Sequence, residues 1–249
     1  MNNKQKLDAI IFDMGSTLIE FENSSWEVLN KLCAKNSYEF LKKKNLIEID
    51  YKIWLFLLES GFEKVFKDSD KNLKEIKFED MMASFFKRLK FKISDGLYSN
   101  FLEAYYKPVT EQLTLVDGAV DVLRFFKGKK IKIGLISNTI FPERFHLDEL
   151  KRFGIFPFLD VFLFSSEVGY KKPHPEIFKL CLKKLNVKPK NSAFLGDRLV
   201  EDIGGAQNMG IKAILLAKKG RDYSKPIVPD GKIDNLCQLK SEVLNFFEI

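Results

Sequence analysis

Hydrophobic positions along the chain follow two different periods. Between residues 22 and 107, apolar side chains recur every three or four positions, the spacing that places them on one face of an α-helix. We expect four amphipathic helices here, with no strand, and we expect their aromatic and Met side chains to pack together because a helix must bury its apolar face. These faces comprise Trp26, Leu29, Cys33 and Phe40; Trp54, Leu58, Phe62 and Val65; Phe78, Met82, Phe85 and Leu89; and Leu97, Phe101 and Tyr105.

Outside this block, short apolar runs alternate with helical stretches. Runs of this kind are typical of parallel strands that are buried on both faces by helices, so the pattern predicts an α/β fold. The runs are Leu7 to Phe12, Ile131 to Ile136, Val161 to Phe164, Ala193 to Leu195 and Ala213 to Leu216. The helices expected between and after them cover residues 118–126, 143–153, 175–185, 202–209 and 239–247.

The position of the helical block predicts the domain organisation. It follows the first strand and precedes all the others, so it reads as an insertion into a sheet domain. We expect residues 1–20 and 109–249 to form the α/β core and residues 21–108 to form an all-helical domain.

Polar side chains follow several of the predicted strands at the point where each strand ends. Asp13 follows the first run, Ser137 and Asn138 follow the second, and Asp197 follows the fourth after one glycine. Ligands of open parallel sheets bind at the carboxyl ends of the strands. Any one of these residues also suits a turn or a helix cap, but two carboxylates and a hydroxyl on neighbouring strand ends point to a site.

Four segments then carry a specific resemblance. Residues 10–18 (IIFDMGSTL) resemble the first motif of the haloacid dehalogenase superfamily, an apolar strand followed by Asp-x-Asp-x-Thr, and residues 134–138 (GLISN) resemble its second. Residues 169–175 (GYKKPHP) are similar to the third motif, a Lys before Pro, and residues 194–202 (FLGDRLVED) to the fourth, Gly-Asp followed by a second acid. The order of the motifs implies a Rossmann-like core with a helical cap inserted after the first strand.

The resemblance implies a phosphatase that acts through an aspartyl-phosphate. Asp13 takes the place of the nucleophile, which splits one displacement into two easier steps. Lys172, preferred over Lys171 because Pro173 follows it, is expected to offset negative charge, and Ser137 is expected to donate its hydroxyl to a phosphoryl oxygen.

Further contacts with the phosphoryl group or substrate are expected from the nucleophile loop and from the second motif. We expect the main-chain N–H groups of Met14, Gly15 and Ser16 to donate hydrogen bonds in such contacts. Asn138 is expected to contribute beside Ser137, and Thr17 is expected to brace the loop.

A carboxylate nucleophile beside a phosphate needs a hard cation with oxygen ligands, so the resemblance implies Mg²⁺. The ligands implied are Asp13, Asp197 and the main-chain carbonyl of Gly15, and Asp202 is expected to bind the ion directly, through water, or by positioning Asp197. Asp202 is also a credible N-cap for the helix that we expect from 202 to 209.

One expected carboxylate is missing. The second Asp of the first motif, which serves as general acid and base in the family, is replaced by Gly15, and Glu20 or Glu22 is a weak candidate to substitute for it. We therefore expect slow turnover, or turnover restricted to good leaving groups. Two alternatives stay open: a metal-free haloacid dehalogenase, and a member that binds a phosphorylated ligand or a partner without catalysis.

Composition adds limits on partners and location. The net charge is +7, but the Lys residues are scattered through helical stretches, which favours a small phosphorylated substrate over nucleic acid. Three widely separated cysteines, Cys33, Cys181 and Cys237, read as reduced packing residues, and the polar N-terminus and the lack of a long apolar run favour a cytoplasmic protein without membrane insertion. We expect His146 on a helix surface and His174 in a loop. The oligomeric state is open.

Overall fold

The computed structural model describes residues 4–91 and 93–249, and the chain divides into two compact units. One unit comprises Met1–Glu20 and Leu115–Ile249, and the other comprises Phe21–Thr114. Residues 1–3 of the polar N-terminal segment are outside the described part, as are the side chains at positions 64–66, 68 and 95. The predicted apolar position of Val65 therefore lies outside it.

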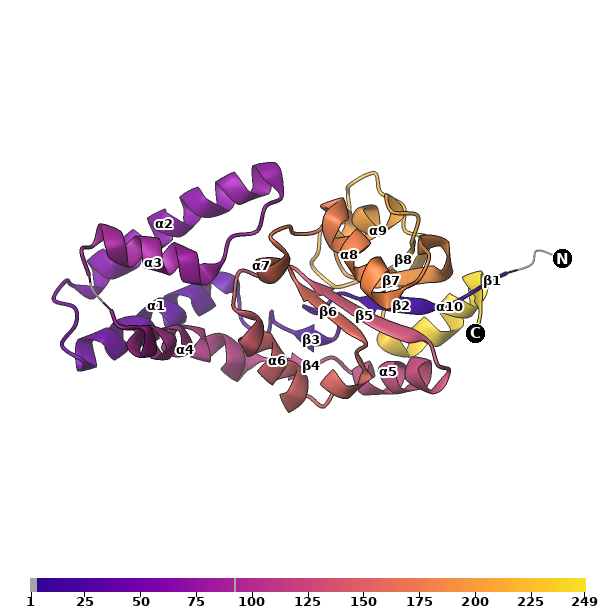
Figure 1. Cartoon of the computed structure of the whole chain (residues 1–249), viewed down its shortest axis with the longest axis horizontal. Helices are drawn as coiled ribbons and strands as arrows, with labels where there is room; N and C mark the ends of the chain where they lie inside the picture. The colour runs from indigo at the N-terminus through magenta and orange to yellow at the C-terminus, as the bar shows by residue number, and fades with distance from the viewer. Residues whose placement is uncertain (1–3, 92) are drawn as a thin grey trace. The chain divides into compact units, whose positions relative to one another are not determined.

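A parallel sheet of six strands, as far as the chain is described, forms the centre of the first unit. The strand order is β6-β5-β2-β7-β8-β9. Helices α8 (Pro175–Leu185) and α5 (Ala119–Gly128) lie on opposite faces of the sheet (Figure 1). The predicted α/β fold class is confirmed. The strands are β2 (Ala9–Phe12), β5 (Lys132–Ser137), β6 (Val161–Phe164), β7 (Ser192–Gly196), β8 (Lys212–Leu216) and β9 (Gly231–Ile233).

The apolar runs predicted five of these strands to within two residues at each end. The sixth strand, β9, was missed because it is three residues long and its middle residue, Lys232, is exposed. Two short pairs complete the strands: β1 (Gln5–Lys6) with β10 (Phe247–Glu248), and β3 (Ile19–Glu20) with β4 (Thr114–Leu115).

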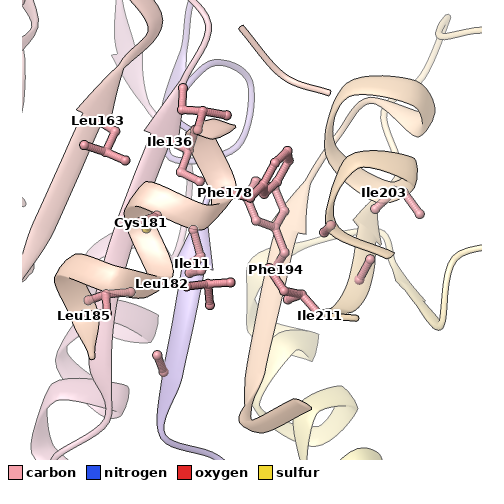
Figure 2. Packing of buried hydrophobic residues seen from close by; sticks show 14 of the residues in the cluster. Ile11, Ile136, Leu163, Phe178, Cys181, Leu182, Leu185, Phe194, Ile203 and Ile211 are labelled. Carbon is pink, nitrogen blue, oxygen red and sulfur yellow. The ribbon is translucent and has the colours of Figure 1, made fainter. Parts of the chain in front are cut away.

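One face of the sheet packs against α8 through fully buried side chains. Ile11 of β2 and Phe194 of β7 meet Phe178 and Cys181 of the helix (Figure 2). Gly205 permits this packing, since a Cβ there would lie 2.6 Å from the Phe178 ring. Burial of these groups stabilises the sheet by about 25 cal/mol for each Å² of apolar surface removed from water, and holds the strand ends in place.

The second unit contains the four predicted helices. They are α1 (Trp26–Lys43), α2 (Tyr51–Asn72), α3 (Phe78–Arg88) and α4 (Asp95–Gln112). Trp54 lies at the centre of this unit, fully buried, with the rings of Phe85 and Phe101 edge-on at 5.3 and 6.3 Å. The aromatic stripes therefore pack as expected, except that Trp26, at the first position of α1, is 40% exposed.

Helix α4 continues beyond the predicted end of the helical block at residue 107. It passes through Pro108 to Gln112, because Val109 extends the buried face of Phe101 and Tyr105 by one further turn. The division between the two units accordingly falls at Thr114 and Leu115, six residues after the predicted boundary. No helix within residues 4–91 and 93–249 is long and apolar enough to cross a membrane.

The cysteines only partly match their predicted packing role. Cys33 and Cys181 are buried, whereas Cys237 is exposed, and all three are free thiols. Burial raises the pKa of the Cys181 thiol to about 12, so this side chain behaves as an apolar packing group.

Candidate active site

Asp13 lies directly after β2, between the ends of the neighbouring strands β5 and β7. Its main-chain N–H donates to the carbonyl of Leu195 at 2.8 Å, which continues the ladder by one residue. Lys172 Nζ donates to Asp13 Oδ1 at 2.5 Å, and Thr17 Oγ1 donates to Oδ2 at 3.2 Å. Both carboxylate oxygens of this 7% exposed residue are therefore held in a defined orientation.

The chain turns sharply after Asp13. The carbonyl of Met14 accepts from the N–H groups of Leu18 and Ile19 at 2.9 and 3.0 Å, and Ser16 adopts a left-handed φ of 55°. The Ser16 N–H donates to the carbonyl of Ile19 at 2.7 Å. This group was expected to contact a ligand, but the turn already uses it.

Lys172 is buried and makes three hydrogen bonds. Its ammonium group donates to Asp13 Oδ1, to Asp202 Oδ1 at 2.7 Å and to the carbonyl of Ile136 at 3.0 Å. An ammonium has three protons, so these partners saturate it. Burial favours the neutral amine, but the Asp13 and Asp202 carboxylates outweigh that effect and raise the pKa of Lys172 well above its ordinary value. The side chain is a fixed positive charge beside Asp13.

The second motif places a hydroxyl and an amide at the end of β5. The Ser137 hydroxyl makes no hydrogen bond with the described part of the chain, and the residue is 7% exposed. The amide of Asn138 instead binds main chain: Nδ2 donates to the carbonyl of Lys172 at 2.9 Å, and Oδ1 accepts from the Lys172 N–H at 2.7 Å. Asn138 thus holds the segment that carries Lys172, a role the sequence did not predict.

Asp202 lies inside a helical turn and not at its start. The π-helical segment η3 (Leu199–Gly204) begins three residues earlier, and Asp202 Oδ2 accepts from the Arg198 N–H at 2.9 Å. The expectation that Asp202 is the N-cap is therefore wrong, because the apolar pattern placed the helix start too late. Its other oxygen binds Lys172, which joins it to Asp13 through one ammonium group.

Three carboxylates, of Asp13, Asp197 and Asp202, bring oxygen atoms to within 4.8 Å of one another. Within the described chain neither buried oxygen of Asp197 accepts a well-aligned hydrogen bond, although Arg221 Nε lies 2.6 Å from Oδ2. Burial and the charges of the other two carboxylates raise the pKa of Asp197 to about 8. Burial likewise raises the pKa of Asp13 to about 6.

These features fit a divalent cation. The raised pKa values of Asp13 and Asp197 mean that their negative charge is not fully offset in this compact set of carboxylates, and hard cations such as Mg²⁺ prefer oxygen ligands. The sequence indicated these three carboxylates but missed Arg221, because a lone Arg in a loop after β8 matches no motif. The two histidines lie apart from this cluster: His174 caps α8, whereas His146 is 2% exposed, so its predicted surface position is wrong.

Gly196 gives Asp202 the room it needs. A Cβ at position 196 would overlap the Asp202 side chain, which cannot retreat because Lys172 and Arg198 hold it. We expect Gly196→Ala to lower stability by about 1–3 kcal/mol, as overpacking does, and to weaken metal binding. Thermal unfolding with and without MgCl₂ measures both effects. Gly128→Ala on α5 is the matched control, since a Cβ there meets nothing within 4 Å; equal effects of the two changes would contradict the argument.

Comparison with known proteins identifies the family. A model of haloacid dehalogenase-like hydrolases matches residues 7–210. The chain belongs to this family. A glyceraldehyde 3-phosphate phosphatase of Methanothermobacter thermautotrophicus is 38% identical over 119 residues, a match that spans about half of each chain (46% of this one and 52% of that one). The enzyme of the same name from Methanocaldococcus jannaschii is 27% identical over 96% of this chain and 98% of its own.

A solved structure shares the whole fold. The 2-haloacid dehalogenase of Pseudomonas syringae pv. Tomato has a TM-score of 0.71 at 19% identity, with 96% of this chain and 99% of that chain covered. At this identity the likeness shows the fold alone. The family includes both phosphatases and dehalogenases, so the choice between the two chemistries rests on the site residues of this chain.

Proposed function

We propose that this hydrolase is a Mg²⁺-dependent phosphatase that acts on a small phosphorylated metabolite, with Asp13 as the nucleophile. The observation that carries the proposal is the cluster of three carboxylates formed by Asp13, Asp197 and Asp202, in which Asp197 accepts no aligned hydrogen bond from the described chain. A dehalogenase that attacks carbon has no evident use for two further buried carboxylates. The names of the two phosphatase relatives favour a phosphorylated sugar or a similar metabolite.

The proposed reaction has two displacements at phosphorus. An Asp13 carboxylate oxygen attacks, the ester oxygen leaves, and water then releases phosphate from the aspartyl-phosphate. Thr17 and Lys172 fix the orientation of the carboxylate, and Lys172 also offsets its charge. Ser137, whose hydroxyl is free of other described partners, would donate to a phosphoryl oxygen.

The residues proposed to hold Mg²⁺ are Asp13, Asp197, Asp202 and the main-chain carbonyl of Gly15. Bound there, the ion would supply positive charge for the phosphoryl oxygens during transfer. Asn138 and the main-chain N–H groups of Met14 and Gly15 are proposed to complete the substrate contacts. The helical unit, residues 21–114, is proposed to act as the cap that selects the substrate.

Gly15 shapes the expected substrate range. It removes the side chain that would protonate the leaving oxygen, a contribution typically worth about 10²- to 10⁴-fold. Aryl and acyl phosphates release stable anions and need little protonation, so we expect them to react faster than alkyl phosphates.

The test is a panel of sugar phosphates, aryl phosphates and acyl phosphates, assayed with MgCl₂ and with EDTA. Hydrolysis that requires Mg²⁺, together with a phosphorylated protein trapped by acid quench, supports the proposal. Release of halide from a haloacid in EDTA would favour the dehalogenase. Binding of phosphate esters without any turnover would favour the non-catalytic alternative.

We expect the stabilisation of the protein by Mg²⁺ to be larger at pH 8 than at pH 6. The pKa of Asp197 rises from 3.8 to about 8 on folding, so between these pH values the metal-free folded chain binds more protons than the unfolded chain, and its stability falls as pH rises. Mg²⁺ needs the deprotonated ligands and displaces those protons, so its affinity rises over the same range. Thermal unfolding in MgCl₂ and in EDTA at the two pH values measures the effect.

Asp197→Asn is the control for this pH dependence. The amide keeps the shape of the side chain but has no proton to release in this range, so we expect a smaller Mg²⁺ effect that changes less with pH. An Mg²⁺-induced shift in the parent that is equal at both pH values, or larger at pH 6, would show that these carboxylates do not bind the ion.

A further inference from the structure

A hydroxyl, an imidazole and a carboxylate form a buried chain next to the loop that follows β5. Thr139 Oγ1 lies 2.8 Å from His146 Nε2, and His146 Nδ1 lies 2.8 Å from Glu149 Oε2. His146 and Glu149 both belong to α6 (Glu143–Arg152), and each is 2% exposed. These groups take no part in the chemistry proposed above, and we call them the Thr139–His146–Glu149 relay.

The surrounding bonds hold each group of the relay in place. Thr139 Oγ1 already accepts from the N–H of Phe141 at 3.1 Å. On the imidazole, Nε2 pairs with the Thr139 hydroxyl and Nδ1 pairs with the Glu149 carboxyl group, so both ring nitrogens have a directional partner. The imidazole ring also stacks on Phe164 with ring centroids 5.0 Å apart. Every polar atom of the relay named here then has a partner, and the ring orientation is fixed.

The relay is attached to the candidate site through the loop. The Thr139 N–H donates to Ser165 Oγ at 2.8 Å, and that hydroxyl donates back to the Thr139 carbonyl at 3.1 Å. The two preceding residues are Ser137 and Asn138. Asn138 in turn binds both main-chain groups of Lys172. A displacement of Thr139 would therefore move the Ser137 hydroxyl and the support of Lys172 together.

Stability alone is a poor reason for this arrangement. Burial of a carboxylate with an imidazole carries a large desolvation cost, and apolar side chains of similar volume are often at least as stabilising. A relay of directional bonds, by contrast, allows one loop position and excludes others. A site for phosphoryl transfer needs that accuracy, since a displacement of about 1 Å can cost ~10²-fold in rate.

We propose that Thr139, His146 and Glu149 are positioning residues, which fix Ser137 at the end of β5 and Asn138 after it and, through Asn138, the segment carrying Lys172. This inference rests on the proposed function for its kinetic consequence. Its structural consequence, the coupling of Thr139 to Lys172, is independent of catalysis.

The structural test measures hydrogen exchange at the Lys172 amide, whose proton is bonded to Asn138 Oδ1. Thr139→Val keeps the shape of the side chain and removes the hydroxyl, so we expect exchange at Lys172 to accelerate at least about tenfold, since Asn138 is no longer held. Thr139→Ser restores the hydroxyl and should return the rate to within about threefold of the parent. Unchanged exchange in Thr139→Val would overturn the proposal, whatever the kinetics show.

The kinetic test uses the full-length variants with Mg²⁺ and the best phosphate ester of the panel. We expect Thr139→Val and His146→Leu to lower kcat about tenfold or more with KM changed less than threefold, because the loop acts in the transition state more than in binding. Glu149→Gln, which keeps an acceptor for Nδ1–H, should lose less. Leu150→Ala, at a fully buried position on the same helix, controls for loss of stability and should leave kcat within about twofold when assayed below its melting temperature.

The outcomes separate the two proposals. A parent that hydrolyses no ester refutes the proposed function, while the exchange experiment still decides the positioning role. An active parent whose kcat survives Thr139→Val and His146→Leu, or falls equally with Leu150→Ala, overturns the positioning role and leaves the proposed function standing.

Discussion

Asp13→Asn is expected to reduce phosphate ester hydrolysis by at least about 10⁴-fold while the protein remains folded. The amide retains the size of the carboxylate and can still bind Thr17 and Lys172, but it has no anionic oxygen to attack phosphorus. Loss of a covalent nucleophile belongs to the largest single effects on an enzyme. Rates measured under saturating substrate and Mg²⁺, with acid-quench trapping of phosphoprotein, give the result directly.

The melting temperature of Asp13→Asn controls for loss of activity by unfolding. Burial already disfavours the charged form of Asp13 and raises its pKa to about 6. Above pH 6 Asp13 is charged in the folded, metal-free protein, and this charge is less favourable there than in the unfolded chain. A neutral amide should therefore leave the melting temperature equal or higher at pH 8. A folded variant that retains substantial hydrolysis and still forms phosphoprotein would place the nucleophile elsewhere.

The sequence predicted the fold well where one signal dominated. Fully buried strands such as β2 and β7 read as apolar runs because helices cover both of their faces. The short strand β9 carries no such signal. It forms because Gly231 and Lys232 pair with strand β8 at the edge of the sheet. This pairing depends on the assembled sheet and leaves no local pattern in the sequence.

The sequence predicted those site residues whose place is set by the main chain, at the ends of strands. Asp13 and Asp197 directly follow strands and Ser137 is the last residue of one, so the sheet alone brings them together. Contacts between distant side chains carry no such sequence signal. The approach of Arg221 to Asp197, and the burial of His146 beside Glu149, both depend on how loops and helices pack after the sheet has formed.

The backbone conformation at Gly15 allows a side chain to be introduced at this position. Gly15 does not adopt a positive φ; Ser16 takes the left-handed conformation of this turn instead, with φ of 55°. A side chain at position 15 therefore meets no backbone penalty of the kind that makes glycine necessary. Glu20, the alternative acid, is bonded to Ser16 Oγ at 2.8 Å and lies 3.4 Å from Lys218, so it is held by partners of its own.

Gly15→Asp is expected to accelerate hydrolysis of alkyl phosphates by some part of the ~10²- to 10⁴-fold range of general acid–base catalysis. The new carboxyl group would protonate the leaving oxygen and then activate water for the second displacement. Aryl phosphates should gain much less in the first step, because their leaving anions are already stable. The measurement is the ratio of alkyl to aryl single-turnover rates in variant and parent, with both proteins saturated with Mg²⁺.

Single-turnover rates are needed because the second step is common to all substrates. If hydrolysis of the aspartyl-phosphate limits kcat, Gly15→Asp would raise steady-state rates for alkyl and aryl esters alike, and the ratio would hide the effect on the leaving group. Gly15→Asn is the matched control, since it adds the same volume without an acid and should keep the alkyl-to-aryl ratio of the parent.

An unchanged ratio in Gly15→Asp, with the variant folded and Mg²⁺ bound, would mean that another group already protonates the leaving oxygen or that alkyl phosphates do not bind productively. Glu20→Gln in the parent would then test the first of these explanations for Glu20, because it lowers alkyl phosphate turnover if Glu20 is the group that protonates the leaving oxygen.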